Sequence, residues 1–425
     1  MEHKSIRIWS IFKDRSDYVK ASRLLGLEAA KNVLSDEQIS AALLENGITK
    51  LTAKDELLVI HDGSDIRKEY ASKLDNLGKV RSLDGRIING YNSFNTIAVD
   101  LDGKDVTLLG TEIYSNRAEE FISQKDIKLV SKPLSKQATP EEKEHYDAIL
   151  SKIENTEYIN TSIVTKQQIK KISDELKQNT PQKKLIHVLD RGADDNELFK
   201  FIDNILNDKF VIRLKASRLA EQNDKTSATE KLVTKEFPNK HEKHYIKIQI
   251  KSKVYQDANS IIEWGETLKG YSVVRIQLIN RDGGRIFKQP MLLISNKSIA
   301  NAEDAMKLYH IYLKRAKIEG VFKFLKDVLG WEESQIRDFK AIKTILTFCY
   351  FVAGYFYEIE SALIENDVIK FIAYLGNGKG KVTRYYILQG FAKMITKVEV
   401  DDAIVQFSIT PDQIKQIMQL MMRGY

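Results

Sequence analysis

The chain has 425 residues, a net charge of +7 and a charged fraction of 29%. This length exceeds what one small hydrophobic core organises, so we expect two or three structural regions. The modest positive charge agrees with nucleic-acid binding, although many soluble lysine-rich proteins share it.

The composition also argues against a secreted or membrane protein. The lone cysteine, Cys349, cannot form an internal disulfide and favours a reducing cytoplasm. The N-terminus has no long apolar core, so we expect no signal peptide. The most apolar stretch, residues 345–357, is too short to span a bilayer and predicts a buried helix.

The first residues, up to about 50, predict helices. Residues 17–31 carry apolar side chains at helical spacing, and Ser35 with Gln38 forms a capping signal for a helix over 35–46. A small helical module in this place can bind DNA or simply pack against the core, and the sequence leaves both open.

Strand-like patterns begin near residue 55. Leu57 to Ile60 is an apolar run, and Asp62 follows it. An Asp at the exit of a buried strand can hold a cation in a cleft, but it can also form a turn or cap a helix. Asp65 is the local competitor. Two Asp-Gly turn signals follow before residue 115, and they predict three antiparallel strands with Asp62 on the first.

A second acidic candidate stands at the end of another strand. Leu185 to Leu189 predicts a buried strand that ends at Asp190, and ligands in open α/β sheets gather beyond the carboxyl ends of strands. We expect Asp194 and Asp195 to cap the next helix. Arg191 either contacts DNA phosphate or pairs with a local acid.

The remaining middle of the chain alternates between loops, helices and strands. Residues 118–145 predict a polar loop, 141–155 and 166–179 helices, and 209–214 a strand. Residues 217–290 predict a β-rich insertion. Lysines of this insertion can face DNA or form the polar side of a half-exposed sheet; they are Lys247, Lys251 and Lys253.

Four polar residues share one helical spacing: Tyr312, Arg315, Glu319 and Lys326. On one continuous helix they fall in a sector about 60° wide. Such a stripe is often only a solvated face. A carboxylate, two cations and a phenol nevertheless suit a phosphodiester beside a metal ion. The adjacent sector is apolar and can pack; it holds Ile311, Ile318, Phe322, Leu325 and Leu329.

The spacing Y-x2-R-x3-E-x6-K resembles the signature of the DDE transposases of the insertion sequence 4 family, also called the YREK group. The strand before Asp62, and the strand followed by D-R-G at Asp190, are similar to the other two acidic motifs of that family. The resemblance extends from about residue 50 to about residue 335. It implies an α/β fold: a ribonuclease-H-like mixed sheet flanked by helices, interrupted by a β-rich insertion, with helical N- and C-terminal regions.

The resemblance also implies a chemistry. Asp62, Asp190 and Glu319 would be catalytic and would bind two Mg²⁺ ions, for which Mn²⁺ can substitute. Tyr312, Arg315 and Lys326 would hold DNA phosphate near a flipped terminal base during hairpin formation.

Relatives place an apolar wedge before the signature helix. Met291 occupies the matching position, and Trp264 is a weaker candidate. Met291 can equally be a core residue of the strand M-L-L-I-S.

The C-terminal part predicts helices joined by the glycine-rich stretch at 376–381, with a last helix that starts at Pro411. The stretch lacks the frame of a phosphate-binding loop. Our division of the chain is a helical DNA-binding module, a core in two parts around the β insertion, and a helical region for dimerisation: residues 1–50, 51–216 with 291–335, 217–290, and 336–425.

The expected partners are double-stranded DNA at the terminal inverted repeats of an element, target DNA, and a second copy of the chain in a homodimer, without a membrane. The expected location is the bacterial cytoplasm, at the nucleoid. Two alternatives stay open: a related nuclease without strand transfer, and a non-catalytic DNA-binding derivative.

Overall fold

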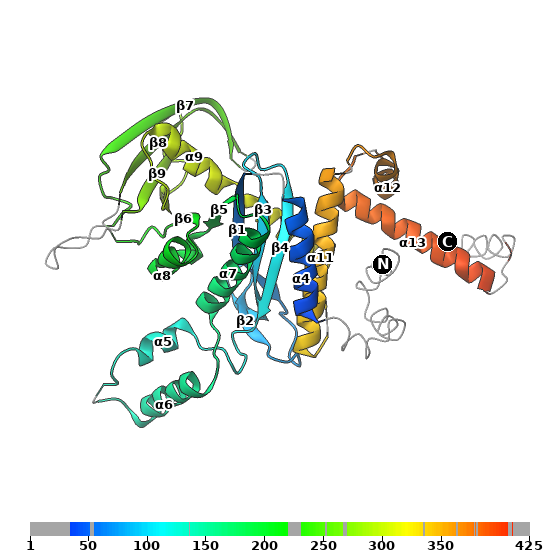
Figure 1. The fold of residues 1–425 in the computed structure, drawn as a ribbon, viewed down its shortest axis with the longest axis horizontal. Helices are drawn as coiled ribbons and strands as arrows, with labels where there is room; N and C mark the ends of the chain where they lie inside the picture. The colour runs from blue at the N-terminus through cyan, green and yellow to red at the C-terminus, as the bar shows by residue number, and fades with distance from the viewer. Residues whose placement is uncertain are drawn as a thin grey trace.

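The computed structural model describes residues 35–410, except for 52–54, 136, 220–230, 251–252, 267–269, 335, 363, 378, 380 and 407–409. A large mixed sheet forms its centre, and helices flank the sheet and stand at both ends of the described chain (Figure 1). This confirms the predicted ribonuclease-H-like α/β fold. The helix expected at 17–31 and the one expected from Pro411 lie outside the described residues.

The sheet has ten strands in the order β2-β3-β1-β5-β6-β10-β9-β8-β7, and β4 pairs with β3. The β1–β5 and β5–β6 pairs are parallel, and the other described pairs are antiparallel. The strands are β1 Glu56–Arg67, β2 Gly78–Arg81, β3 Ile87–Val99, β4 Val106–Tyr114, β5 Lys184–Leu189, β6 Lys209–Arg213, β7 Asn239–Ile250, β8 Lys253–Glu266, β9 Ser272–Ile279 and β10 Met291–Ser295.

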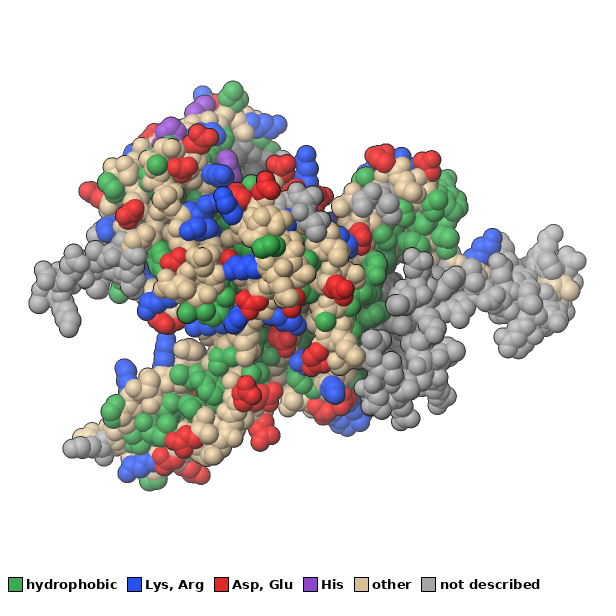
Figure 2. Space-filling model, viewed as in Figure 1, with side chains coloured by type: hydrophobic (Ala, Val, Ile, Leu, Met, Phe, Trp, Pro, Cys, Tyr) green, Lys and Arg blue, Asp and Glu red, His purple; other side chains and the backbone are tan. Residues whose placement is uncertain are grey.

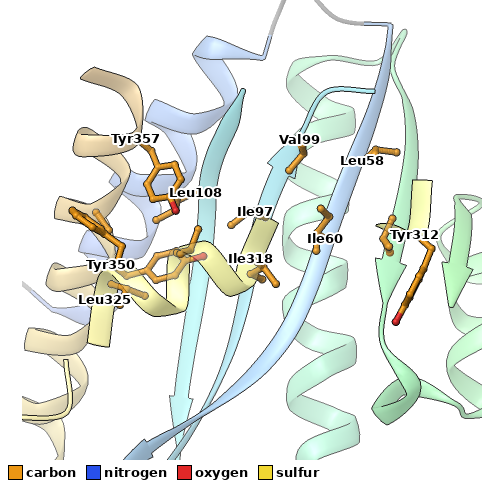
Figure 3. Close-up of a cluster of buried hydrophobic side chains, with 14 of the residues drawn as sticks. Leu58, Ile60, Ile97, Val99, Leu108, Tyr312, Ile318, Leu325, Tyr350 and Tyr357 are labelled. Carbon is orange, nitrogen blue, oxygen red and sulfur yellow. The ribbon is translucent and has the colours of Figure 1, made fainter. Parts of the chain in front are cut away.

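Helices cover both faces of the sheet because its central strands are apolar on both sides. Leu57 to Ile60 of β1 are fully buried, and alternate residues point to opposite faces. Val59 packs with residues of α7 (Thr161–Asn179) and α4 (Asp36–Lys50). On the other face, Ile60 packs with residues of α9 (Ala302–Leu313), α10 (Ala316–Lys323) and α11 (Phe339–Ala362) (Figure 3).

The capping signals predict helix starts correctly. Ser35 and Gln38 form a reciprocal capping box at α4. The predicted helices near 141–155 and 166–179 are α6 and α7, and the predicted polar loop at 118–145 also contains the short α5, which the sequence analysis missed. The remaining helices are α5 Gln124–Val130, α6 Pro140–Asn155, α8 Asn196–Lys200, α11 Phe339–Ala362, α12 Asp367–Asn377 and α13 Arg384–Gln406.

The predicted β insertion continues the central sheet. Strands β7, β8 and β9 follow one another by antiparallel pairing, and β9 pairs with β10 over five positions. Since β10 also pairs with β6, the hydrogen-bonded ladder runs from the core strands into the insertion without a break. The insertion is therefore held by backbone hydrogen bonds and by shared core residues such as Val274 and Ile276.

The predicted single helix from Tyr312 to Lys326 is wrong. The chain forms α9 (Ala302–Leu313), then α10 (Ala316–Lys323), then a π-helical turn over Phe324–Val328. Between α9 and α10, the amide groups of Lys314 and Arg315 donate to carbonyls only three residues back. Tyr312 before this tight turn and Ile318 after it are both buried.

Helix α11 is the most apolar element. Among the described helices it is the one long and apolar enough to cross a membrane by length and composition. Its side chains Leu346, Tyr350 and Ala353 are nevertheless buried in the core, and the Tyr350 hydroxyl donates to the Thr96 carbonyl at 3.1 Å. The expectation of a buried helix at 345–357 is confirmed, although the helix is longer than predicted.

Two glycines allow α12 and α13 to touch. A Cβ atom on Gly390 would lie 1.8 Å from the carbonyl oxygen of Ile372, and one on Gly376 would lie 2.0 Å from that of Tyr386. Because no side chain fits at these distances, the helix pair depends on glycine at both positions.

Candidate active site

Asp62 and Asp190 stand on neighbouring parallel strands. The β1–β5 ladder ends with Ile60 paired to Val188. Asp62 and Asp190 each lie two residues further on, and the two-residue period of a strand directs both carboxylates to the face that α10 covers. The expectation that Asp62 stands at a strand exit is wrong, because β3 continues its pairing with β1 up to Arg67.

The residues after β5 form a tight turn. Asp190 accepts a hydrogen bond from the Gly192 amide at 2.6 Å, and Asp195 caps α8 as predicted. Asp194 does not cap this helix. Its carboxylate pairs with Arg218 at 2.8 Å, because that guanidinium reaches it from the segment after β6.

Arg315 joins two of the three candidate carboxylates. One guanidinium nitrogen lies 2.5 Å from Asp62, and another lies 2.5 Å from Glu319. The Arg315 and Asp62 side chains are 17% and 16% exposed, whereas Glu319 is 60% exposed. The turn between α9 and α10 places Arg315 over β1, so the guanidinium supplies the positive charge that these acids require.

Asp62 lies in the electrostatic field of the other two candidate acids. Burial raises the pKa of Asp62 to about 7, the charge of Arg315 opposes that rise, and the negative charges of Asp190 and Glu319 add to it. Burial is the main cause of the raised pKa of Asp62, and the opposing effect of Arg315 is larger than that of either neighbouring acid.

Tyr312 lies beside these acids but not on an open surface. It is 5% exposed, and burial raises the pKa of its hydroxyl. Its hydroxyl also interacts with Arg213, the last residue of β6. Sequence reasoning missed Arg213, although its place at the end of a strand beside β5 is a signal for this edge of the sheet.

Lys326 takes part in a separate ionic network. Its ammonium donates to the Asp65 carbonyl at 2.6 Å and pairs with Glu332 at 3.2 Å. Arg67 donates to both carboxylate oxygens of Glu332, at 2.7 to 3.0 Å. Burial raises the pKa of Glu332, but the bonds from Arg67 and Lys326 outweigh burial and leave it below its usual value. No local pattern could have revealed Glu332, because its partner Arg67 comes from β1, which is distant in the sequence.

The other candidate DNA contacts are spread over the molecule. Arg191 is exposed in the turn after Asp190. Met291 is half-buried at the start of β10, at the sheet edge where β6 ends, and it packs against the core. Trp264 is buried near the end of β8. Lys247 and Lys253 are exposed, and Lys251 lies outside the described residues.

The donor chemistry fits a divalent cation. Hard cations take carboxylate oxygens, and three carboxylates act on one another here. As the described side chains are oriented, no three acidic, His or Cys residues stand close enough to share one ion. The guanidinium of Arg315 lies between Asp62 and Glu319 in this arrangement, so the two acids could share an ion only if it moved.

A ribonuclease-H-like sheet with clustered carboxylates is the arrangement of metal-dependent nucleic-acid enzymes. The family model described as Transposase DDE domain matches residues 101–353, and the chain belongs to this family. Its members act on DNA with divalent metal ions. The match includes Asp190 and Glu319, whereas Asp62 precedes it. No curated protein matches the chain at a significant level.

Proposed function

We propose that this protein is a DNA transposase of the insertion sequence 4 family, in its YREK group, and that Asp62, Asp190 and Glu319 are its catalytic residues. The observation that carries the proposal is the bridge from Arg315 to Asp62 and Glu319, with Asp190 on the adjacent strand. Carboxylates with perturbed pKa values that come from distant parts of the chain are candidates for a functional site.

The proposed reaction begins with hydrolysis at the end of the element. A water oxygen forms a bond to phosphorus, the bond from phosphorus to the 3′ oxygen breaks, and the 3′ oxygen leaves as a hydroxyl group. The oxygen of this hydroxyl then forms a bond to a phosphorus of the opposite strand, and the bond from that phosphorus to the 3′ oxygen of the flanking DNA breaks, which closes a hairpin. Water hydrolyses the hairpin bond and restores the 3′ hydroxyl, which attacks a phosphorus of target DNA and displaces the 3′ oxygen of the target strand. Two Mg²⁺ ions, or Mn²⁺, would activate water and stabilise charge on the phosphate when held by Asp62, Asp190 and Glu319.

The residues of the chain would bind and orient the DNA. Arg315 pairs with Asp62 and Glu319 in the absence of an ion, and a bound cation would release its guanidinium to a phosphate. Lys326 would contact phosphate from its place beside Glu332, and Tyr312 would hold the terminal phosphate. Met291 would support the flipped base, and Arg191 would bind the backbone nearby.

Removing Arg315 or Lys326 should differ from removing an acid. Arg315→Ala and Lys326→Ala should keep the first nick but weaken hairpin formation and binding to the element end. Loss of Mn²⁺ binding in either variant would contradict the role in phosphate binding.

The ends of the chain have proposed roles as well. Residues 1–50 would bind the element ends, and 336–425 would pair two copies in a homodimer. Apolar side chains gather on the C-terminal helices in Figure 2, where Val368, Phe371 and Tyr374 of α12 are 63%, 55% and 54% exposed. A large exposed apolar patch supports a protein interface. The protein would act in the cytoplasm, at the nucleoid.

A cleavage assay on a labelled duplex that carries the element's terminal repeat tests the proposal. The wild type with Mg²⁺ should nick the end, close a hairpin and join it to target DNA, and Asp190→Asn and Glu319→Gln should do none of these. Glu303→Gln, at the start of α9, is a matched control that should retain activity. Cleavage without joining would identify a nuclease, and end binding without cleavage a non-catalytic derivative.

A further inference from the structure

A chain of buried polar side chains crosses the sheet on the face opposite the acids. Thr96 of β3 bonds to His61 of β1 at 2.8 Å, His61 bonds to His187 of β5 at 2.9 Å, and His187 bonds to Asp208 at 3.1 Å. Asp208 lies just before β6 and accepts a bond from Ser173 of α7 at 2.5 Å. All five side chains are at most 5% exposed.

Every ring nitrogen of the two histidines has a partner. The Asp208 carboxylate can only accept, so His187 donates to it from Nε2. His187 Nδ1 bonds to His61 Nε2, and His61 Nδ1 bonds to the Thr96 hydroxyl, so no polar atom of either ring is left without a partner.

The two histidines of this hydrogen-bonded row lie close in sequence to two of the candidate acids. His61 directly precedes Asp62, and His187 stands three residues before Asp190. The backbone ladder of β1 and β5 ends at Ile60 and Val188, so the bond between His61 and His187 is the side-chain link nearest to the place where the ladder ends.

The surrounding residues make this link unusual. On the same face, apolar residues pack against α7, among them Val59, Ala98 and Leu109. Apolar side chains would bury this surface without fixing a direction, whereas hydrogen bonds fix distance and angle and contribute little net stability. This row of hydrogen-bonded side chains therefore fixes the relative position of β1 and β5 more than it stabilises the fold.

We propose that Thr96, His61, His187 and Asp208 form a brace of positioning residues that fixes the separation of the Asp62 and Asp190 carboxylates. The inference rests on the proposed function, because it assumes that both acids bind a metal ion. Residues that orient metal ligands typically change metal affinity by 10- to 100-fold when they are removed.

Two substitutions of His187 separate the two halves of the brace. Asn places an amide near the position of Nδ1 and can keep the bond to His61, whereas Gln reaches the position of Nε2 and can keep the bond to Asp208. Mn²⁺ binding to the full chain, followed by the electron paramagnetic resonance of the free ion, measures the effect without DNA. His187→Gln should raise the Mn²⁺ dissociation constant about 10-fold, and His187→Asn less than about 2-fold.

A second matched pair covers the case in which the His187 variants do not fold. Thr96→Val and Ser173→Ala each remove one buried hydroxyl, and the two hydroxyls lie at opposite ends of the row of hydrogen-bonded side chains. Thr96→Val should weaken Mn²⁺ binding several-fold, because it frees His61, whereas Ser173→Ala should leave it unchanged.

The outcomes separate the two proposals. Equal Mn²⁺ affinity in both members of a folded pair would overturn the brace, while loss of binding in Asp190→Asn would still support the proposed function. If Asp190→Asn binds Mn²⁺ as the wild type does, the proposed metal site is wrong, and the proposal of the brace, which depends on that site, is wrong as well.

Discussion

Replacing Asp62 by Asn should stabilise the protein when no metal ion is bound. Burial, opposed by Arg315 and aided by the charges of Asp190 and Glu319, raises the pKa of Asp62 from 3.8 to about 7. Between these pH values the folded state holds a proton that the unfolded state has released, so the free energy of unfolding falls as the pH rises. At about 1.4 kcal/mol per pH unit, the loss reaches about 4 kcal/mol above pH 7.

Asn carries no charge at any of these pH values, so its variant should not show this loss. Urea unfolding in EDTA at pH 5 and pH 8.5 measures both proteins. The variant should exceed the wild type by about 3 to 4 kcal/mol at pH 8.5 and by about 1 to 2 kcal/mol at pH 5, since most of the loss lies between the two. Its gain at high pH comes with loss of a proposed catalytic group.

Asp65→Asn is the matched control on the same strand. Its carboxylate accepts bonds from the Arg81 amide and the Asn92 side chain, so its removal should destabilise the protein. Since Asp62 remains, the fall in stability with rising pH should also remain. A difference between Asp62→Asn and the wild type that does not grow from pH 5 to pH 8.5 would refute the assignment of that fall to Asp62.

Three further changes test other parts of the molecule. Glu332→Gln should cost about 2 kcal/mol at pH 7. The lowered pKa of Glu332 means that this stability is present above pH 4.5 and is lost as the pH falls through the lowered value, so the difference from the wild type should shrink steadily as unfolding is measured at pH values below 4.5. Gly390→Ala should cost about 1 to 3 kcal/mol and speed proteolysis near α12, with Mn²⁺ binding unchanged. Burial raises the pKa of Cys349 to about 12, so a thiol reagent at pH 8 should modify it only after unfolding; rapid reaction of the folded chain would contradict the packing of α11.

The sequence predicted what depends on local patterns. The apolar run before Asp190 and the capping box at Ser35 specify a strand and a helix start through neighbouring residues alone. The length of β1 was not predictable in this way, because its second half contains Asp62, Gly63 and Asp65 and is held by pairing with β3. Tertiary pairing overrides weak strand propensity there.

The candidate site was predictable in composition but not in arrangement. The spacing of Arg315 and Glu319 marked both residues, yet the turn before α10 and the bridge to Asp62 depend on contacts with β1. Lys326 carried the same signature, but its partner Glu332 is recognisable only when β1 brings Arg67 to it. Ion pairs between residues that are distant in the sequence produce no periodic sequence pattern, so they cannot be predicted from local spacing.

The pairing of β6 with β10 has a consequence for synthesis of the chain. Roughly 80 residues separate these two strands, and at about 5 to 20 residues per second the ribosome needs about 4 to 16 s to make them. The outer edge of β6, with its apolar Phe210 to Ile212, lacks its native neighbour during that interval. Strand edges of this kind pair readily with other nascent chains, so expression at lower protein concentration or with a chaperone should raise the soluble yield.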